Sequence, residues 1–263
     1  MIGQLARIAG VDALLGKLET ARFNALLPVT IEVLEELAKP DKSDALSRYR
    51  LLIGKKELET KSAMPLEQGT KYWGVMKESG KNHAITLSQL LQKPKLLQNR
   101  QLVSILPAFT PQKLAHVMSA QSPKTEMKMQ LLEHLSGAQS KQEFMTLANM
   151  ITALQQDLFT MLLKYQDRHT LFQFKKRRTQ SQTSSEDGMI DFYAAFEHIG
   201  PVEGVVEVQG DSRRLTLYLY YEESMVFLQN ELETLGFEGR LLPKKAQIKP
   251  LCEPVSSLLD IKG

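Results

Sequence analysis

The sequence predicts an α+β protein: N-terminal helices, a small antiparallel β unit, a central helical segment, and a C-terminal α/β sandwich-like domain with antiparallel strands and one main packed helix. Three observations favour this class. Apolar residues recur every three or four positions over residues 11–39 and 85–165, which is typical of amphipathic helices. Short runs punctuated by glycine and proline fill residues 48–77, which is typical of strands. From residue 190, two alternating runs precede a helical pattern closed by glycine.

The first segment, residues 1–45, is expected to be helical. Apolar residues at helical spacing form one stripe: Leu14, Leu15, Leu18, Ala21, Ala25, Ile31, Leu34 and Leu37. Pro28 indicates a break within it. Pro40 ends the pattern, because proline disfavours helical geometry in the residue before it.

Residues 46–80 are expected to form the small antiparallel β unit. The runs "YRLLIG" and "KELETKS" flank Gly54-Lys55 as the arms of a hairpin flank its turn, and "KYWGVMK" reads as a third strand. Tyr49, Tyr72 and Trp73 lie among lysines, a mixture that can bind single-stranded nucleic acid by stacking and phosphate neutralisation. The alternative, which we favour, is that these aromatic residues belong to the core.

Residues 81–166 are expected to be helical again. Thr110 is placed as an N-cap with Pro111 in the first turn. The run "KQEFMTLANMITALQQDLFTMLLKYQ" predicts a helix of more than four turns through one set of apolar positions: Phe144, Leu147, Ile151, Leu154, Leu158, Met161 and Leu162. Six methionines lie between Met118 and Met161, and they fit either an adaptable binding groove or, more commonly, a core.

The last segment, residues 167–263, is expected to be the C-terminal αβ domain. "TLFQFKKRR" reads as a strand, and "KKRR" within it is either a basic patch or a solvated strand end, the interpretation we favour. Residues 179–188 form the clearest predicted loop. Two alternating runs then predict strands, and a helix beginning near Glu222 is expected to bury Met225, Leu228, Leu232 and Leu235. Gly236 fits a helix C-cap, and "RLLP" is expected to return to the sheet edge.

Charge is unevenly distributed along the chain. Residues 1–188 carry a formal charge of +8, and residues 189–263 carry −5. A basic N-terminal half combined with an αβ C-terminal domain keeps one alternative open, a nucleic-acid-binding protein. The acidic C-terminal unit lacks the aromatic pattern of RNA-recognition sheets, which argues against that function.

Residue patterns that carry chemistry are missing from the sequence. It contains no Gly-rich phosphate loop, no dinucleotide fingerprint and no nucleophile elbow. One cysteine, Cys252, cannot form an intramolecular disulfide or a zinc knuckle. The five histidines are far apart in sequence: His83, His116, His134, His169 and His198. We therefore expect no catalytic residues, no metal, no cofactor and no small-molecule substrate, although an enzyme with a dispersed site around His169 or His198 is a third alternative.

The segment from His198 to Pro243 resembles the C-terminal domain of flagellar hook-length control proteins. Apolar positions and glycines carry the resemblance: Ile199, Gly200, Val202, Val206, Val208, Leu215, Leu217, Leu219, Val226, Leu228, Leu232, Leu235 and Gly236. An upstream element with Pro65, Leu66 and Gly69 also looks like one found in hook-length-control-like proteins. The helices and β unit expected in the N-terminal half replace the low-complexity half that the family's better-known members carry.

The resemblance implies a non-enzymatic bacterial protein that acts in flagellar assembly. Its partners would be a protein of the flagellar type III export apparatus, whose substrate specificity it switches from hook to filament subunits, and the hook subunits themselves. We expect the contact residues to be Tyr218, Tyr220, Tyr221 and Phe237, because tyrosines offer a large contact area at low entropic cost; Tyr221 also fits a core position. No apolar run reaches the length of a membrane span, so we expect a cytoplasmic protein that this pathway can export.

Overall fold

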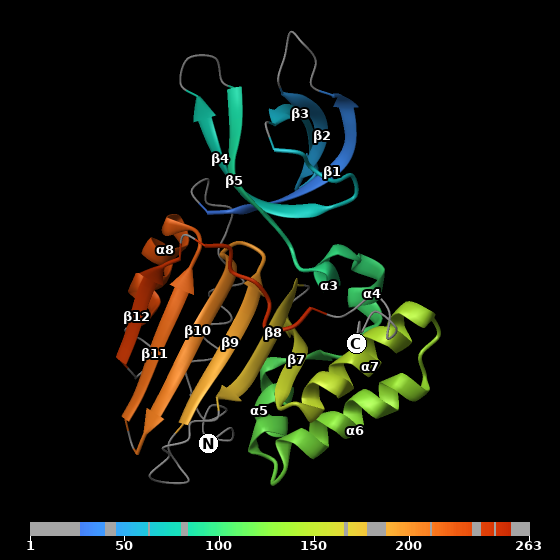
Figure 1. The fold of residues 1–263 in the computed structure, drawn as a ribbon, viewed down its shortest axis with the longest axis vertical. Coiled ribbons are helices and arrows are strands. Elements are labelled where there is room, and N and C mark those ends of the chain that lie inside the picture. Colours follow the sequence, from blue (N-terminus) through green and yellow to red (C-terminus); the bar gives the residue numbers. More distant parts are fainter. Residues whose placement is uncertain are drawn as a thin grey trace, which may run out of the picture.

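A computed structural model describes residues 27–39, 46–62, 64–79, 84–165, 168–177, 188–210, 212–232, 238–244 and 246–253. Two sheets with mostly antiparallel pairing and six helices make up this part of the chain, which confirms the mixed α+β class. The five-stranded sheet stands above one end of the seven-stranded sheet in Figure 1. None of the described helices is long and apolar enough to cross a membrane.

The five-stranded sheet has the order β3-β2-β1-β4-β5, and every pair in it is antiparallel. Its strands are β1 (Val29–Ala38), β2 (Ser47–Ile53), β3 (Lys56–Ser62), β4 (Lys71–Ser79) and β5 (Ala84–Gln92). The predicted hairpin is confirmed, because Ile53 pairs with Lys56 across the turn and Gly54 takes a φ of 63° that favours glycine. The predicted third strand is β4.

The helix expected over residues 11–39 is wrong from Val29 onward, where the chain forms β1. Val29, Ile31 and Val33 are buried, and they alternate with partly exposed neighbours as a strand requires. Register shifts follow Val33 and Glu36, and each inserts an extra residue into the strand. Leu34 and Leu37 are these extra residues, and with Ile31 they recur every three positions in the sequence, which imitates helical spacing. Residues 1–26 lie outside the described part.

The predicted helical region, residues 81–166, contains five helices but also three strands. The helices are α3 (Lys95–Gln98), α4 (Arg100–Ile105), α5 (Pro111–Ser119), α6 (Pro123–Ser136) and α7 (Lys141–Gln155). The predicted N-cap is confirmed, because the Thr110 hydroxyl accepts a hydrogen bond of 3.2 Å from the Lys113 amide. Residues 85–92 belong to β5 instead of a helix.

The helix predicted through residue 162 ends at Gln155, and the chain continues as β7 (Leu158–Tyr165). Asp157 has a φ of 60°, which a helix cannot accommodate. All six residues from Leu158 to Leu163 are buried, so β7 is covered on both faces. A strand of this kind is nearly uniformly apolar, and its composition cannot be distinguished from that of a buried helix by spacing alone.

The seven-stranded sheet has the order β12-β11-β10-β9-β8-β7-β6. Its remaining strands are β6 (Ala108–Phe109), β8 (Arg168–Arg177), β9 (Gly188–Phe196), β10 (Gly200–Gln209), β11 (Ser212–Leu219) and β12 (Glu238–Pro243). The edge strands β6 and β12 are parallel to their neighbours, and the inner strands are antiparallel. The predicted strands and the return of "RLLP" to the edge are confirmed, but the sheet also includes β6 and β7, which precede residue 167.

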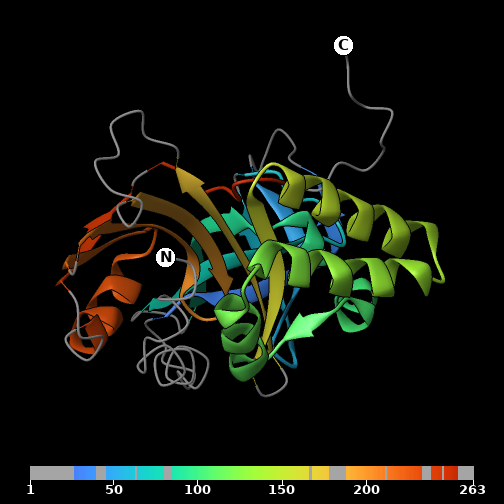
Figure 2. The same ribbon diagram turned by 90° about the horizontal axis from the view of Figure 1, so that it is seen from below.

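Helices lie at the two opposite edges of this sheet. The α5–α7 group lies beside β7, and α8 (Glu222–Leu232) lies beside β11 and β12 at the opposite end (Figures 1 and 2). Phe192 from β9 fits against Gly204 of β10, where a Cβ atom would lie 2.3 Å from the ring. The inward side of β9–β11 and α8 form one apolar cluster: Ala194, Phe196, Ile199, Val202, Leu215, Leu217, Leu219 and Leu228.

The two sheets share a core where they meet. Trp73 of β4 is 1% exposed, belongs to the same apolar cluster as the α5–α7 helices, and donates its indole N–H to the Phe196 carbonyl at 2.9 Å. Tyr221 donates its hydroxyl to the Gln89 carbonyl of β5 at 3.0 Å. These long-range contacts join the β unit to the C-terminal sheet, while a second apolar cluster around Ile31 and Leu51 lies within the β unit itself.

Candidate interaction surface

The pairing of β8–β11 separates an inward and an outward side of the seven-stranded sheet. Cross-strand partners point to the same side, so Lys175, Asp191, Val205 and Thr216 form one row. A neighbouring row continues the same side through Arg177, Met189, Glu207 and Arg214, and Glu203 pairs with Tyr218. We call these ten residues the outward face; each of them is partly or fully exposed.

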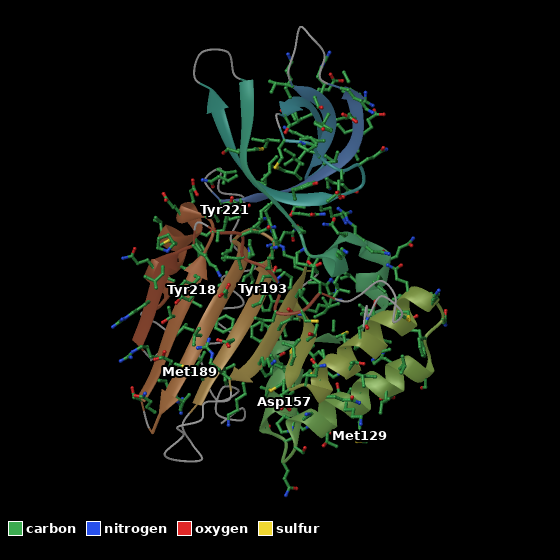
Figure 3. All side chains as sticks on the ribbon, viewed as in Figure 1. Met129, Asp157, Met189, Tyr193, Tyr218 and Tyr221 are labelled. Carbon is green, nitrogen blue, oxygen red and sulfur yellow. The ribbon has the colours of Figure 1, made fainter. Side chains whose placement is uncertain are left out.

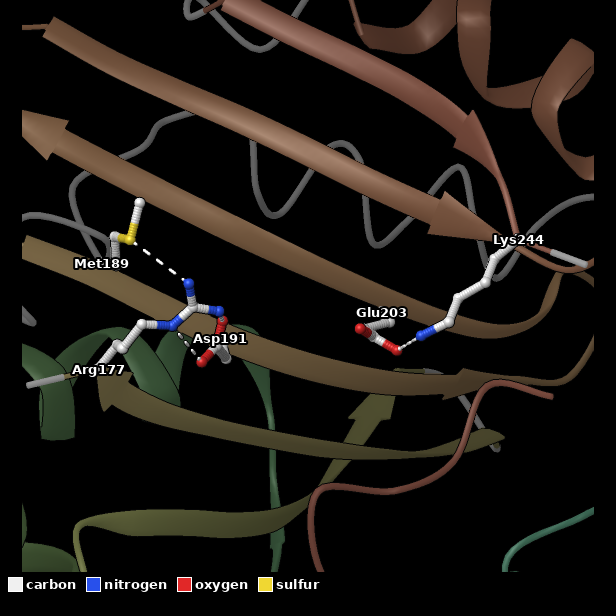
Figure 4. A network of polar contacts seen from close by, with 5 residues as sticks. All are labelled: Arg177, Met189, Asp191, Glu203 and Lys244. Atoms are coloured by element: carbon white, nitrogen blue, oxygen red, sulfur yellow. Dashed lines mark hydrogen bonds and ion pairs between the residues drawn. The ribbon is translucent and has the colours of Figure 1, made fainter. Parts of the chain in front are cut away.

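Ion pairs run across this face between neighbouring strands. The Arg177 guanidinium contacts the Asp191 carboxylate through two nitrogens, at 2.5 and 3.1 Å, and its third nitrogen lies 3.6 Å from the Met189 sulfur (Figure 4). Arg214 lies 3.6 Å from Glu207. Exposed pairs of this kind stabilise a fold by only about 0–1 kcal/mol each. Their alternating charge instead gives the face a pattern that a complementary partner can recognise.

Tyr218 ends one row of the outward face. Its half-buried ring lies opposite Glu203, whose carboxylate forms an ion pair with Lys244 (Figures 3 and 4). The Lys244 ammonium is 6.0 Å from the centroid of the Tyr218 ring. The strand therefore presents a partly exposed aromatic ring, and aromatic residues are enriched at protein interfaces.

Tyr221 is not a surface contact, because its side chain is fully buried. Burial raises the pKa of its hydroxyl well above the ordinary value, and the nearby Tyr220 and Glu223 raise this pKa further. Tyr220 is half-buried and meets the Tyr221 ring edge-on, with 5.0 Å between the centroids. Of the four expected contact residues, only Tyr218 lies on the outward face; Phe237 lies outside the described residues.

The family-motif positions fall into three groups. Val206, Val208, Leu215 and Leu217 lie on the inward side, opposite the outward face. Gly200 has a φ of 84°. Leu232 is the last residue of α8, its side chain is not described, and Leu235 and Gly236 are outside the described residues.

The upstream motif lies in the β unit, away from the outward face. Pro65 is exposed and Leu66 is buried, with its amide donating to the Tyr49 hydroxyl at 3.1 Å. Gly69 has a φ of 76° and donates its amide to the Val33 carbonyl at 2.8 Å. These residues turn the chain against β1, which is a structural role.

The other surface hypotheses have different outcomes. Tyr49, Tyr72 and Trp73 are all buried, which confirms the core interpretation and removes the stacking surface. Of the six methionines in the helical region, four are buried, namely Met118, Met127, Met150 and Met161. Met129 is exposed on α6 (Figure 3). Lys175 is an exposed residue of the outward face, while the predicted loop 179–188 falls on undescribed residues except for Gly188, the first residue of β9.

Within the described residues, no three histidine, cysteine, aspartate or glutamate side chains lie close enough together to hold a metal ion. His198 lies where the two sheets meet. Burial lowers the pKa of its imidazole below the usual value, Arg168 and Lys93 lower this pKa further, and Glu197 opposes them. His198 is therefore a neutral residue beside two cations at neutral pH, with Glu197 as the nearby carboxylate.

His198 is expected to make the fold sensitive to mild acid. Because the folded-state pKa lies below the unfolded-state value of about 6.5, the neutral form stabilises the fold fully above that pH and less as the pH falls. Urea unfolding of the wild type and of His198→Gln, at pH 8 and pH 5.5, measures this contribution. The wild type should lose more stability than the variant over this interval. Equal losses would show that His198 does not titrate between the folded and unfolded states.

No protein-family model, curated protein or solved structure matches this chain.

Proposed function

We propose that the chain is a non-enzymatic interaction protein of the flagellar hook-length control type. Its C-terminal unit binds a protein of the flagellar type III export apparatus and switches export from hook to filament subunits. The resemblance rests on residues 198–243, which form one contiguous ββαβ unit made of β10, β11, α8 and β12. The inward motif positions of this unit pack its core, and six of the ten residues of the outward face lie on its strands β10 and β11.

The outward face carries the proposal. It combines paired charges with one accessible tyrosine on a rigid antiparallel sheet, so a partner can dock without reordering the backbone. A protein without catalytic groups changes the state of a partner only by binding one state more tightly than the other. The face therefore supports a switch that works by preferential binding.

Replacing Tyr218 with alanine is expected to weaken binding to the export apparatus while leaving the fold intact. Truncating an aromatic residue at the centre of an interface typically costs about 2 kcal/mol or more, which is roughly thirtyfold in Kd. The matched control is Arg213→Ala, which lies on the same strand but has the opposite side-chain direction. Calorimetric titration with soluble proteins of the export apparatus measures both affinities, and thermal melting checks the fold. Equal affinity for the two variants would exclude the outward face as the docking site.

Deletion of the gene in a flagellated host tests the assignment itself. The expected result is overlong hooks with few filaments, because export of hook subunits would not be switched off. Electron microscopy of purified hook–basal bodies gives the hook length directly. Normal hooks and filaments after deletion would overturn the hook-length assignment.

A further inference from the structure

The described residues that follow β12 cross the outward side of the seven-stranded sheet as a strap. The strap (residues 244 and 246–253) starts where the Lys244 amide donates to the Leu219 carbonyl of β11, at 2.8 Å. It ends against β8, where Cys252 meets Gln173. Figure 1 shows this segment passing in front of β9 and β8. No residue of the strap is in a strand, so sheet pairing does not hold it.

Three points spaced four residues apart fasten the strap. Lys244 forms an ion pair with Glu203, Ile248 is 3% exposed in the core cluster, and Cys252 is bound by Gln173. The residues between these points are exposed or half-buried where they are described. A segment held by isolated points has more freedom to detach than a paired strand, because each point can be lost without breaking a ladder.

Gln173 binds the strap as a strand backbone would. Its side-chain amide donates to the Cys252 carbonyl at 2.7 Å, and its side-chain oxygen accepts the Cys252 amide at 3.3 Å. Both contacts reach main-chain atoms, so they do not depend on the side chain at position 252. Gln173 is 1% exposed and also donates to the Thr160 hydroxyl at 3.1 Å, which fixes the orientation of the amide.

Beneath the strap lies a row that continues the outward face. Tyr193 pairs with Gln173 on one side and with Glu203 on the other, and Tyr218 follows Glu203. Tyr193 is buried, and its pKa is raised by burial first and by Glu253 of the strap second. The strap therefore covers one part of the outward side of the sheet, and the outward face is another part of the same side.

We propose that this row is a binding site for an extended peptide segment, occupied in this structure by the chain's own residues 246–253. The ligand class is an extended polypeptide with an aliphatic residue four positions before the backbone unit that pairs with Gln173. The strap itself supplies this chemistry through Ile248 and Cys252. A partner segment of the same pattern binds by displacing the strap and reaches Tyr218 and the outward face. Only the partner's identity rests on the proposed function.

Peptide exchange tests the site without any flagellar component. The probe is a labelled synthetic peptide of residues 244–253 with serine at position 252, added to the full chain. Wild type and Ile248→Asp are compared, because the variant loosens the strap while leaving the Gln173 site unchanged. Removing an internal competitor raises the apparent affinity by the reciprocal of the fraction of sites that it had left free. We expect Ile248→Asp to bind the peptide at least about tenfold more tightly than the wild type. A peptide with aspartate at position 248 should not bind.

Nitroxide labelling of Cys252 provides a second measurement that does not depend on the folding of Ile248→Asp. Cys252 is the single cysteine of the chain and is exposed, so the label reports on the strap alone. Gln173→Leu should convert the spectrum from immobilised to mobile, and Lys175→Leu, which lies on the same strand and the same side, should not. Equal peptide affinity of wild type and Ile248→Asp, or an immobilised label in Gln173→Leu, would overturn the proposal. Either failure leaves the hook-length phenotype unaffected, and normal hooks leave the peptide site unaffected.

Discussion

Trp73→Ala is expected to lower the free energy of unfolding by about 3–5 kcal/mol, the usual range for removing a fully buried aromatic side chain. Trp73 is 1% exposed and lies between the two sheets. Its indole N–H donates to the Phe196 carbonyl, and the Lys93 ammonium lies 5.2 Å from its ring centroid. The substitution therefore removes packing, a hydrogen bond and a cation–π contact at one position.

Trp73→Phe separates these contributions. Phenylalanine keeps most of the apolar contact but leaves the Phe196 carbonyl without its donor, which costs about 1–3 kcal/mol for a buried polar group. Urea unfolding followed by far-UV circular dichroism measures both variants, because Trp73 is the single tryptophan and its fluorescence is lost. A loss of less than about 1 kcal/mol in Trp73→Ala would mean that the two sheets do not share a core.

Local patterns in the sequence were sufficient wherever a turn or a cap determines the element. Gly54 forms the turn of the β2–β3 hairpin, Thr110 caps the start of α5, and alternating residues predict β9–β11. These signals act over a few residues, so they can be recognised without tertiary contacts. The α+β class followed from them.

The sequence was misleading where tertiary structure changes the local period. In β1, two bulges accommodate apolar residues at helical spacing, and β7 is uniformly apolar because it is buried on both faces. In each case the deciding factor is the neighbouring strand, which lies far away in the sequence. Neither strand could be recognised from its own residues.

The candidate surface could be predicted only in part. Alternation along β11 places Tyr218 opposite the leucines, as expected. Whether a tyrosine just after that strand is exposed depends on its contacts with the β unit. Tyr221 is buried, and its hydroxyl donates to the Gln89 carbonyl of β5. The ion pair between Arg177 and Asp191 depends on the register of two strands. The contact between Gln173 and Cys252 joins residues that are 79 positions apart in the sequence. Sequence spacing contains none of this information.

Gly200→Ala is expected to destabilise the fold by roughly 2–5 kcal/mol through two additive effects. The backbone at Gly200 has a φ of 84°, a conformation that costs an L-residue about 1–2 kcal/mol. A Cβ atom there would also lie 2.6 and 2.7 Å from two carbons of the Tyr221 ring. That ring is fully buried and its hydroxyl is bound to Gln89, so it cannot move aside, and overpacking adds about 1–3 kcal/mol.

Gly210→Ala is the matched control, because it separates backbone strain from the clash. Gly210 also has a positive φ, 54°, but nothing lies within 4 Å of a Cβ added there. Backbone strain alone should therefore lower the free energy of unfolding of Gly210→Ala, by about 1–2 kcal/mol in urea unfolding. Combining Gly200→Ala with Tyr221→Ala should cost less than the sum of the two single losses, since removing the ring removes the clash. Equal losses at the two glycines, or strict additivity in the double variant, would contradict the close approach. The result expected here gives the glycine of the Ile199-Gly200 pair a physical reason: the ring that joins the two sheets occupies the space where any other side chain would begin.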